Sequence, residues 1–144
     1  MKKEVLVLPG SDKEISNKVL VNRVRKKLND GLDMKTEIVD LAWSKRKNLA
    51  QLEEGLDEKI KNINGQVVLV GISVGMTEAI IARHRCGIDK VSEIISVCGW
   101  GWPEIGLTRD EIEKLDKLKR ANPVFGEAME VYKEMFINSF QPSD

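Results

Sequence analysis

The chain has 144 residues, of which 42% are hydrophobic and 32% are charged, and its formal net charge is zero. This length suits one domain that can bury a core without disulfides or a bound metal. The balanced charge gives no overall field toward nucleic acid or an anionic membrane, so we expect neither as a partner. No apolar run is long enough to span a bilayer, and the run at 5–9 is too short for a secretory signal.

The cysteine pattern gives a further exclusion. Cys86 and Cys98 are the two cysteines of the chain, and they have no metal-binding spacing. We therefore expect two reduced thiols that act as small core residues, in a protein without metal or cofactor. Such cysteine usage favours a cytoplasmic location.

Short β-rich runs alternate with helical patterns over the first two thirds of the chain. Strands are predicted at 4–8, 35–41, 66–71 and 91–98, and helices at 16–29, 48–63 and 74–85. Gly31 is expected to end the first of these helices. The second strand half alternates and should lie nearer a sheet edge, whereas the apolar third strand should be central. This order predicts an α/β fold, with helices on both faces of a parallel sheet.

After Pro103 only helical patterns remain. Thr108 and Glu111 form a capping box that predicts the start of one helix. Asn122 followed by proline predicts the start of another. The second helix carries a stripe of apolar side chains that we expect to pack in the core, namely Phe125, Met129, Tyr132, Phe136 and Phe140.

The expected organisation is a single domain over residues 1–144. Residues 1–103 would form the sheet core, and residues 104–144 a helical, cap-like segment. No internal repeat or low-complexity segment interrupts this pattern.

The segment Gly71-Ile-Ser73-Val-Gly75 carries the strongest functional signal. Gly-x-Ser-x-Gly between an apolar strand and a helix is the pattern of a nucleophile elbow. The turn is so tight that side chains two positions before or after the serine would collide with backbone, which accounts for both glycines. The pattern therefore predicts Ser73 as a nucleophile beside a helix N-terminus that stabilises negative charge. The alternative is a glycine-rich turn in another doubly wound domain.

An acyl-transfer site also needs two backbone N–H groups directed at the oxyanion. Val74, directly after the nucleophile, would provide one. The loop after the first strand would provide the other, from Ser11 or Asp12. The alternative for this loop is that Ser11 or Asp12 caps the next helix.

These features resemble the α/β-hydrolase superfamily, and particularly its small intracellular, single-domain, esterase-like members. The resemblance covers residues 4–103, and the helical region up to Phe140 looks like an inserted cap. It implies a sheet with strand order 2-1-3-4, Ser73 as nucleophile, Val74 as an oxyanion donor and an ester or related acyl substrate.

The sequence also departs from the family pattern, in which an acid and then a histidine follow on loops after two further strands. No β-like run and no histidine follow Cys98, and His84, the one histidine, lies eleven residues past Ser73. We expect His84 at the surface or at a helix end. A serine without a base is a poor nucleophile, so we expect little or no turnover. Residues 140–144 resemble a linker to a further strand, so we expect a fragment; a histidine from another chain is the alternative.

Three residues after the fourth strand are further candidates. Glu104 would be the acid of the site, or else a solvated loop carboxylate. Trp100 and Trp102 follow the carboxyl end of that strand, where open α/β sheets bind ligands. They would line an acyl pocket or pack beneath the C-terminal helices.

Two other classes of function compete with a hydrolase. One is a non-catalytic binding module that self-associates through an exposed sheet edge or the cap. The other is a nucleotide- or flavin-binding domain, which is disfavoured because the sequence lacks both GxGxxG and GxxxxGK[ST].

Overall fold

Four parallel strands form one sheet in the order β2-β1-β3-β4. The structure is a computed structural model that describes residues 3–10, 18–32, 34–97 and 108–139. The strands are β1 (Lys3–Leu8), β2 (Thr36–Ile38), β3 (Gln66–Ile72) and β4 (Val91–Val97). The predicted fold class and strand order are confirmed, with the apolar β3 inside the sheet and β2 at its edge.

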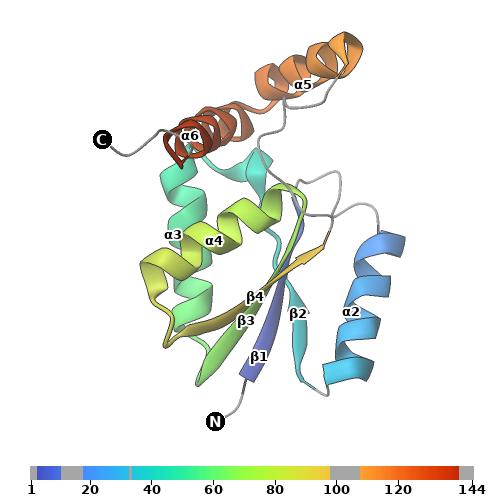
Figure 1. Cartoon of the computed structure of the whole chain (residues 1–144), viewed down its shortest axis with the longest axis vertical. Helices are drawn as coiled ribbons and strands as arrows, with labels where there is room; N and C mark the ends of the chain where they lie inside the picture. The colour runs from blue at the N-terminus through green and yellow to red at the C-terminus, as the bar shows by residue number, and fades with distance from the viewer. Residues whose placement is uncertain (1–2, 11–17, 33, 98–107, 140–144) are drawn as a thin grey trace.

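Helices cover both faces of this sheet (Figure 1). They are α2 (Lys18–Leu32), α3 (Leu49–Lys61), α4 (Val74–Cys86), α5 (Arg109–Ala121) and α6 (Pro123–Ser139), with a 3-10 turn η1 (Trp43–Lys45). Helix α2 lies on one face, and α3 and α4 lie on the other. Helices α5 and α6 lie together beyond the carboxyl ends of the strands.

Two predicted boundaries are wrong. Strand β2 is shorter than the strand predicted at 35–41: the Val39 amide still donates to Val7 of β1, but Ala42 takes a left-handed conformation before η1. Helix α2 continues through Gly31 to Leu32. A glycine inside a helix costs only about 1 kcal/mol, so it does not end a helix whose neighbours favour continuation.

Polar caps fix three predicted helix starts. Asn48 accepts a hydrogen bond from the Gln51 amide at 2.8 Å and begins α3. The capping box is formed between Thr108 and Glu111 at the start of α5. The Asn122 side chain accepts from the Phe125 amide at 3.2 Å, directly before Pro123 begins α6.

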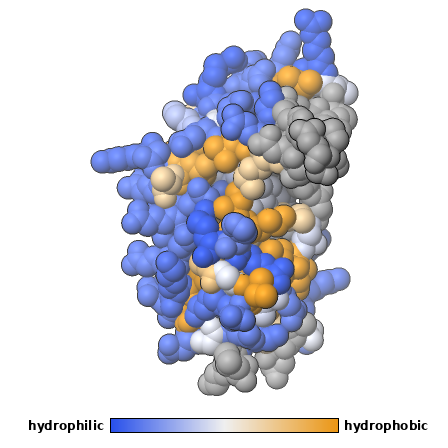
Figure 2. All heavy atoms as spheres, turned by 60° about the vertical axis from the view of Figure 1, so that its left-hand side comes forward, coloured by the Kyte–Doolittle hydropathy of each residue, from blue (hydrophilic) through white to orange (hydrophobic). Residues whose placement is uncertain are grey.

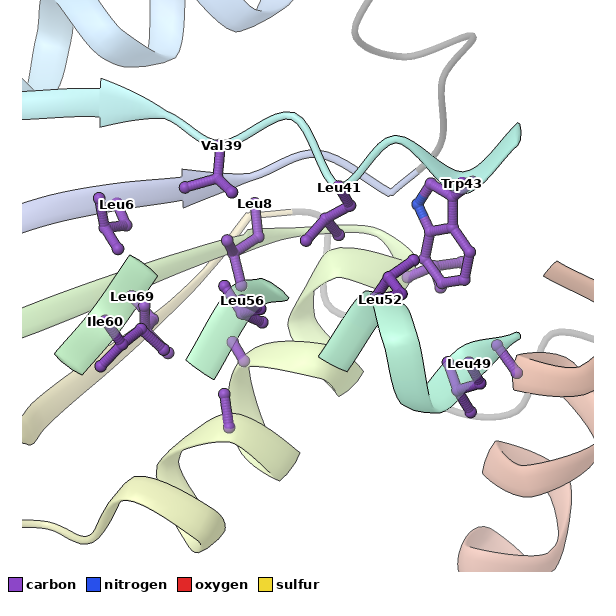
Figure 3. Close-up of a cluster of buried hydrophobic side chains, with 14 of the residues drawn as sticks. Leu6, Leu8, Val39, Leu41, Trp43, Leu49, Leu52, Leu56, Ile60 and Leu69 are labelled. Atoms are coloured by element: carbon purple, nitrogen blue, oxygen red, sulfur yellow. The ribbon is translucent and has the colours of Figure 1, made fainter. Parts of the chain in front are cut away.

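The larger part of the core lies between the sheet and α3. Leu52, Leu56 and Ile60 of α3 face leucine side chains from the strands and are at most 1% exposed (Figure 3). The strand residues in this layer include Leu6, Leu8 and Leu69. The other face of the sheet buries Val5 and Val7 of β1 and Val68 and Val70 of β3, with Val24 and Leu28 of α2 packed against them.

Helix α6 closes one end of this core. Phe125, Met129 and Tyr132 are buried, which confirms core packing for this part of the predicted stripe. The Phe125 ring lies edge-on to Trp43 of η1, with 5.7 Å between the ring centroids. The side chains of Phe136 and Phe140 lie outside the part that the structure describes.

Cys86 packs only at the margin of the core, at the end of α4, and is partly exposed, contrary to the expectation of a core thiol. Burial, followed by the nearby Asp57 carboxylate, raises the pKa of its thiol. Cys98 lies outside the described residues. Among the helices that are described, none combines the length and the apolar character needed to cross a membrane.

Candidate active site

Ser73 stands in the sharp turn between β3 and α4. Its backbone has φ 54° and ψ −122°, a conformation that residues with a side chain rarely adopt. Its amide donates to the carbonyl of Val97 at the end of β4, at 3.3 Å, and its carbonyl accepts from the Met76 amide at 3.1 Å. The turn is therefore held by the neighbouring strand on one side and by the first helical turn on the other.

The two glycines of the motif are required by close backbone contacts. A Cβ at Gly71 would lie 2.2 Å from the Met76 Cα, and a Cβ at Gly75 would lie 2.0 Å from the Leu8 carbonyl oxygen. Real Cβ atoms are not found at such distances from backbone, so a larger residue at either position would force the backbone apart. The steric requirement that the sequence motif implied is thus present at both positions.

The Ser73 hydroxyl is not used as a helix cap. An ordinary serine cap has an extended backbone and accepts from an amide of the first turn. Ser73 has neither feature, and it is partly exposed. The first turn of α4 contains no acidic residue, so the positive end of the helix dipole beside the hydroxyl is not neutralised from within that turn.

Val74 begins α4 directly after the serine, as predicted. A first-turn amide has no partner within its own helix, so the Val74 N–H is of the type that can bind an anion. The Gly75–Leu8 contact brings the end of β1 against the elbow, so the loop after β1 begins at this site with Pro9 and Gly10. Ser11 and Asp12 themselves lie outside the described residues.

The end of β4 also meets the elbow, through the bond from Ser73 to Val97. Three strand ends, those of β1, β3 and β4, therefore converge at Ser73. The further candidates Trp100, Trp102 and Glu104 follow β4 in the sequence and lie outside the described residues.

His84 lies in the last turn of α4 and is exposed, as predicted. Eleven helical residues separate it from Ser73, a distance of about 16 Å along the helix axis. The side chain cannot cover that distance, so the single histidine of the sequence does not serve Ser73 within this chain.

A second feature of α4 was not predicted from the sequence. Glu78 is wholly buried and accepts a hydrogen bond from the Tyr132 hydroxyl of α6. Beside it, Arg85 binds both carboxylate oxygens of Asp57, at 2.8 and 2.9 Å, and also binds Glu53. A signal was present: Glu78 is the one charged residue between Gly75 and Ala82.

Two grooves that described residues line do not include Ser73. A groove of about 570 Å³ is lined by polar and charged residues of α3 and by Arg85. Figure 2 looks toward the side of the molecule that carries α3 and α4, where hydrophobic areas interrupt a mostly hydrophilic surface. Within the described residues, no three histidine, cysteine or acidic side chains are grouped so that they could hold a metal ion.

No family model matches the sequence, and no curated protein or solved structure shows significant similarity to it. The geometry around Ser73 is therefore the ground on which a function can be assigned. That geometry presents a hydroxyl that does not cap its helix, at a strained turn with a helix N-terminus beside it and three strand ends around it.

Proposed function

We propose that this chain is a serine hydrolase of the α/β-hydrolase type, which acts on an ester or related acyl substrate through Ser73. The observation that carries the proposal is the backbone of Ser73, at φ 54° and ψ −122°. Strain of this kind costs about 1–3 kcal/mol and concentrates at functional sites. A turn with only a structural role could relieve that strain with glycine, yet here a hydroxyl is kept.

The proposed reaction begins with attack of the Ser73 Oγ on the acyl carbon. The Oγ–C bond forms as the hydroxyl proton leaves to a base, and the ester C–O bond then breaks, with the proton passing to the departing alkoxide. Negative charge that develops on the carbonyl oxygen would be stabilised by the Val74 N–H and by a second N–H near Ser11 or Asp12. Water then releases the acyl group by the same steps.

The general base is the weak point of this site. His84 is out of reach, and Glu104, the proposed acid, could orient a base but does not replace an imidazole. We therefore propose slow turnover for the chain acting alone. Trp100 and Trp102 remain our proposal for an acyl pocket, because they directly follow β4, which ends beside Ser73.

Covalent labelling tests the proposal directly. The full chain is incubated with a fluorophosphonate, and intact mass followed by peptide mapping locates the adduct. We expect one adduct, on Ser73, and none in the Ser73→Ala variant. Ser96→Ala is the matched control, because it removes an exposed serine near the end of β4 and should label like the wild type. Equal labelling of the wild type and Ser73→Ala would reject Ser73 as the nucleophile.

Added imidazole tests the missing base separately. If the oxyanion site is formed and only the base is lacking, free imidazole should accelerate labelling of the wild type but not of Ser73→Ala. No acceleration, together with no basal labelling, would argue that the elbow is structural.

A second candidate function is self-association. Strand β4 lies at the edge of the sheet and pairs only with β3 among the described strands. Its Ile94 and Ile95 are only partly buried, and Ile88, just before it, is 68% exposed. An open edge of this kind can pair with a second copy. Sedimentation should then show a mass that rises with concentration; a monomer at every concentration would reject this candidate.

The class of ligand and the cellular compartment are inferred from the charge and the cysteines. The zero net charge supports a small acyl substrate over nucleic acid as the ligand. The free thiol of Cys86 supports a reducing compartment, and we propose the cytoplasm.

A further inference from the structure

The buried carboxyl group of Glu78 lies at the junction of three helices. It is on α4, five residues after Ser73, and it is 0% exposed. One of its oxygens, Oε1, accepts from the Tyr132 hydroxyl of α6. The other, Oε2, is also buried and has no hydrogen-bond donor among the described residues. A buried charged oxygen without a donor is costly, so this oxygen requires an explanation.

Glu53 of α3 explains how the buried Oε2 of Glu78 can be satisfied. Its carboxyl group lies within hydrogen-bonding reach of Glu78. Two ionised carboxylates are both acceptors and repel each other, so the pair is stable only when one of them carries a proton. That proton would give the Glu78 Oε2 its missing hydrogen bond.

The surrounding charges decide which of the two holds the proton. Arg85 binds Glu53 and Asp57, so the positive charge of this cluster is directed toward the α3 carboxylates. Arg85 donates a hydrogen bond to Glu53, whereas the donor that Glu78 receives from the described residues is the neutral Tyr132 hydroxyl. The groups that face Glu78 are thus Tyr132 from α6, Glu53 from α3 and Arg85 from its own helix.

The electrostatics agree with this geometry. The pKa of Glu78 is raised from 4.5 to about 7. Burial is the largest cause and the negative charge of Glu53 acts in the same direction, while the Tyr132 hydrogen bond and Arg85 lower the pKa in part. Burial also raises the pKa of Tyr132, so the hydroxyl remains a donor throughout the neutral range.

We propose that Glu78 and Glu53 share one proton while α6 is docked on α4, and that loss of this proton loosens α6, so that the junction is a pH-sensitive latch. An ionised Glu78 would place a second negative charge beside Glu53 in a site closed to water. Opening the contact with Tyr132 lets water reach that charge. The latch is independent of whether Ser73 reacts.

Other contacts of α6 should keep the helix attached when the shared proton is lost, so that the helix loosens only locally. The Glu127 carboxylate of α6 accepts from the Leu49 amide at 3.0 Å, and Phe125 packs against Trp43. Neither contact involves Glu78. We therefore expect the sheet and α3 to stay folded when the latch opens.

The direction of the pH effect follows from linkage. When α6 opens, the Glu78 carboxyl regains a pKa near 4.5, while in the docked form it stays near 7. The open state is therefore favoured progressively between these two values and gains nothing further above them. From pH 5.5 to pH 8 the opening equilibrium should rise by about thirtyfold.

Hydrogen exchange of the full chain at pH 5.5 and pH 8, corrected for the intrinsic exchange rate, measures this opening. In the wild type we expect α6 amides to lose protection by about thirtyfold at the higher pH, with β3 unchanged. In Glu78→Gln the loss should vanish, because the amide has the same shape, accepts from Tyr132 and donates to Glu53 without a proton. Glu54→Gln, an exposed neighbour on α3, is the control and should behave like the wild type.

Two results would overturn the latch. One is equal pH dependence of α6 protection in the wild type and Glu78→Gln. The other needs no variant: a ¹³C-detected titration of the wild-type carboxyl groups in which Glu78 titrates at its ordinary pKa. Glu53→Gln adds a directional check, because removing the neighbouring negative charge should move the transition in α6 protection to lower pH.

Discussion

Replacing Ser73 with glycine should stabilise the protein relative to replacing it with alanine. Both variants lose the hydroxyl, so their difference isolates the backbone. Alanine keeps a side chain at φ 54° and ψ −122°, where glycine meets no steric penalty. Almost everywhere else in a folded protein, glycine is the less stable of the two residues.

The magnitude follows from two opposing effects. The strained backbone costs a residue with a Cβ about 1–3 kcal/mol, which glycine removes. Glycine loses more freedom on folding than alanine, which costs about 0.4–1 kcal/mol. The free energy of unfolding of Ser73→Gly should therefore exceed that of Ser73→Ala by about 1 kcal/mol.

Urea unfolding followed by far-UV circular dichroism measures this difference. Ser96 provides the matched pair, because it lies in the extended strand β4 with an ordinary backbone. There, glycine should be less stable than alanine by about 0.5–1 kcal/mol. If Ser73→Gly were no more stable than Ser73→Ala, the turn would not hold the strain, and the main support for a nucleophile at Ser73 would be lost.

Two further predictions concern stability. Gly75→Ala should destabilise the protein by about 1–3 kcal/mol in urea unfolding, because its Cβ would meet the Leu8 carbonyl. Gly31→Ala is the control: a Cβ there meets nothing within 4 Å, so this variant should stabilise α2 slightly. The free energy of unfolding, measured at several pH values, tests the raised pKa of Glu78. The raised pKa contributes stability that is complete below pH 4.5 and is lost as pH rises through 7. Relative to Glu78→Gln, the wild type should lose up to about 3 kcal/mol over this window; an unchanged difference would contradict it.

Much of the fold follows from patterns that are local in sequence. Apolar runs separated by helical periods predicted the parallel sheet, and the resemblance to a family supplied its strand order. The errors occur where distant contacts decide. Whether the run at 35–41 stays in the sheet depends on where the backbone must turn toward Trp43, which packs against α6. A Cβ at Gly31 would meet nothing within 4 Å among the described residues, so no close neighbour there requires the helix to end, and the sequence cannot show this.

The elbow could be predicted because the residues of its motif are consecutive, although the contact that requires Gly75, with Leu8, joins distant parts of the chain. Gly71 must approach Met76, and this need is local. The contact between Glu78 and Tyr132 could not be predicted, because the two residues are 54 positions apart and nothing in the sequence pairs them. A lone acid in an apolar helix did mark Glu78 as unusual, but it did not identify a partner.

The two ends of α4 explain how a strained residue can persist at its start. Strand β3 is paired along its length with β1 and β4, so the residue before the turn cannot shift to relax Ser73. Farther along the helix, Arg85 fastens α4 to Asp57 of α3. The helix is therefore fixed both before and after the position where the Tyr132 contact opens. For this reason we expect the latch to alter the packing of α6 while the conformation of Ser73 is retained.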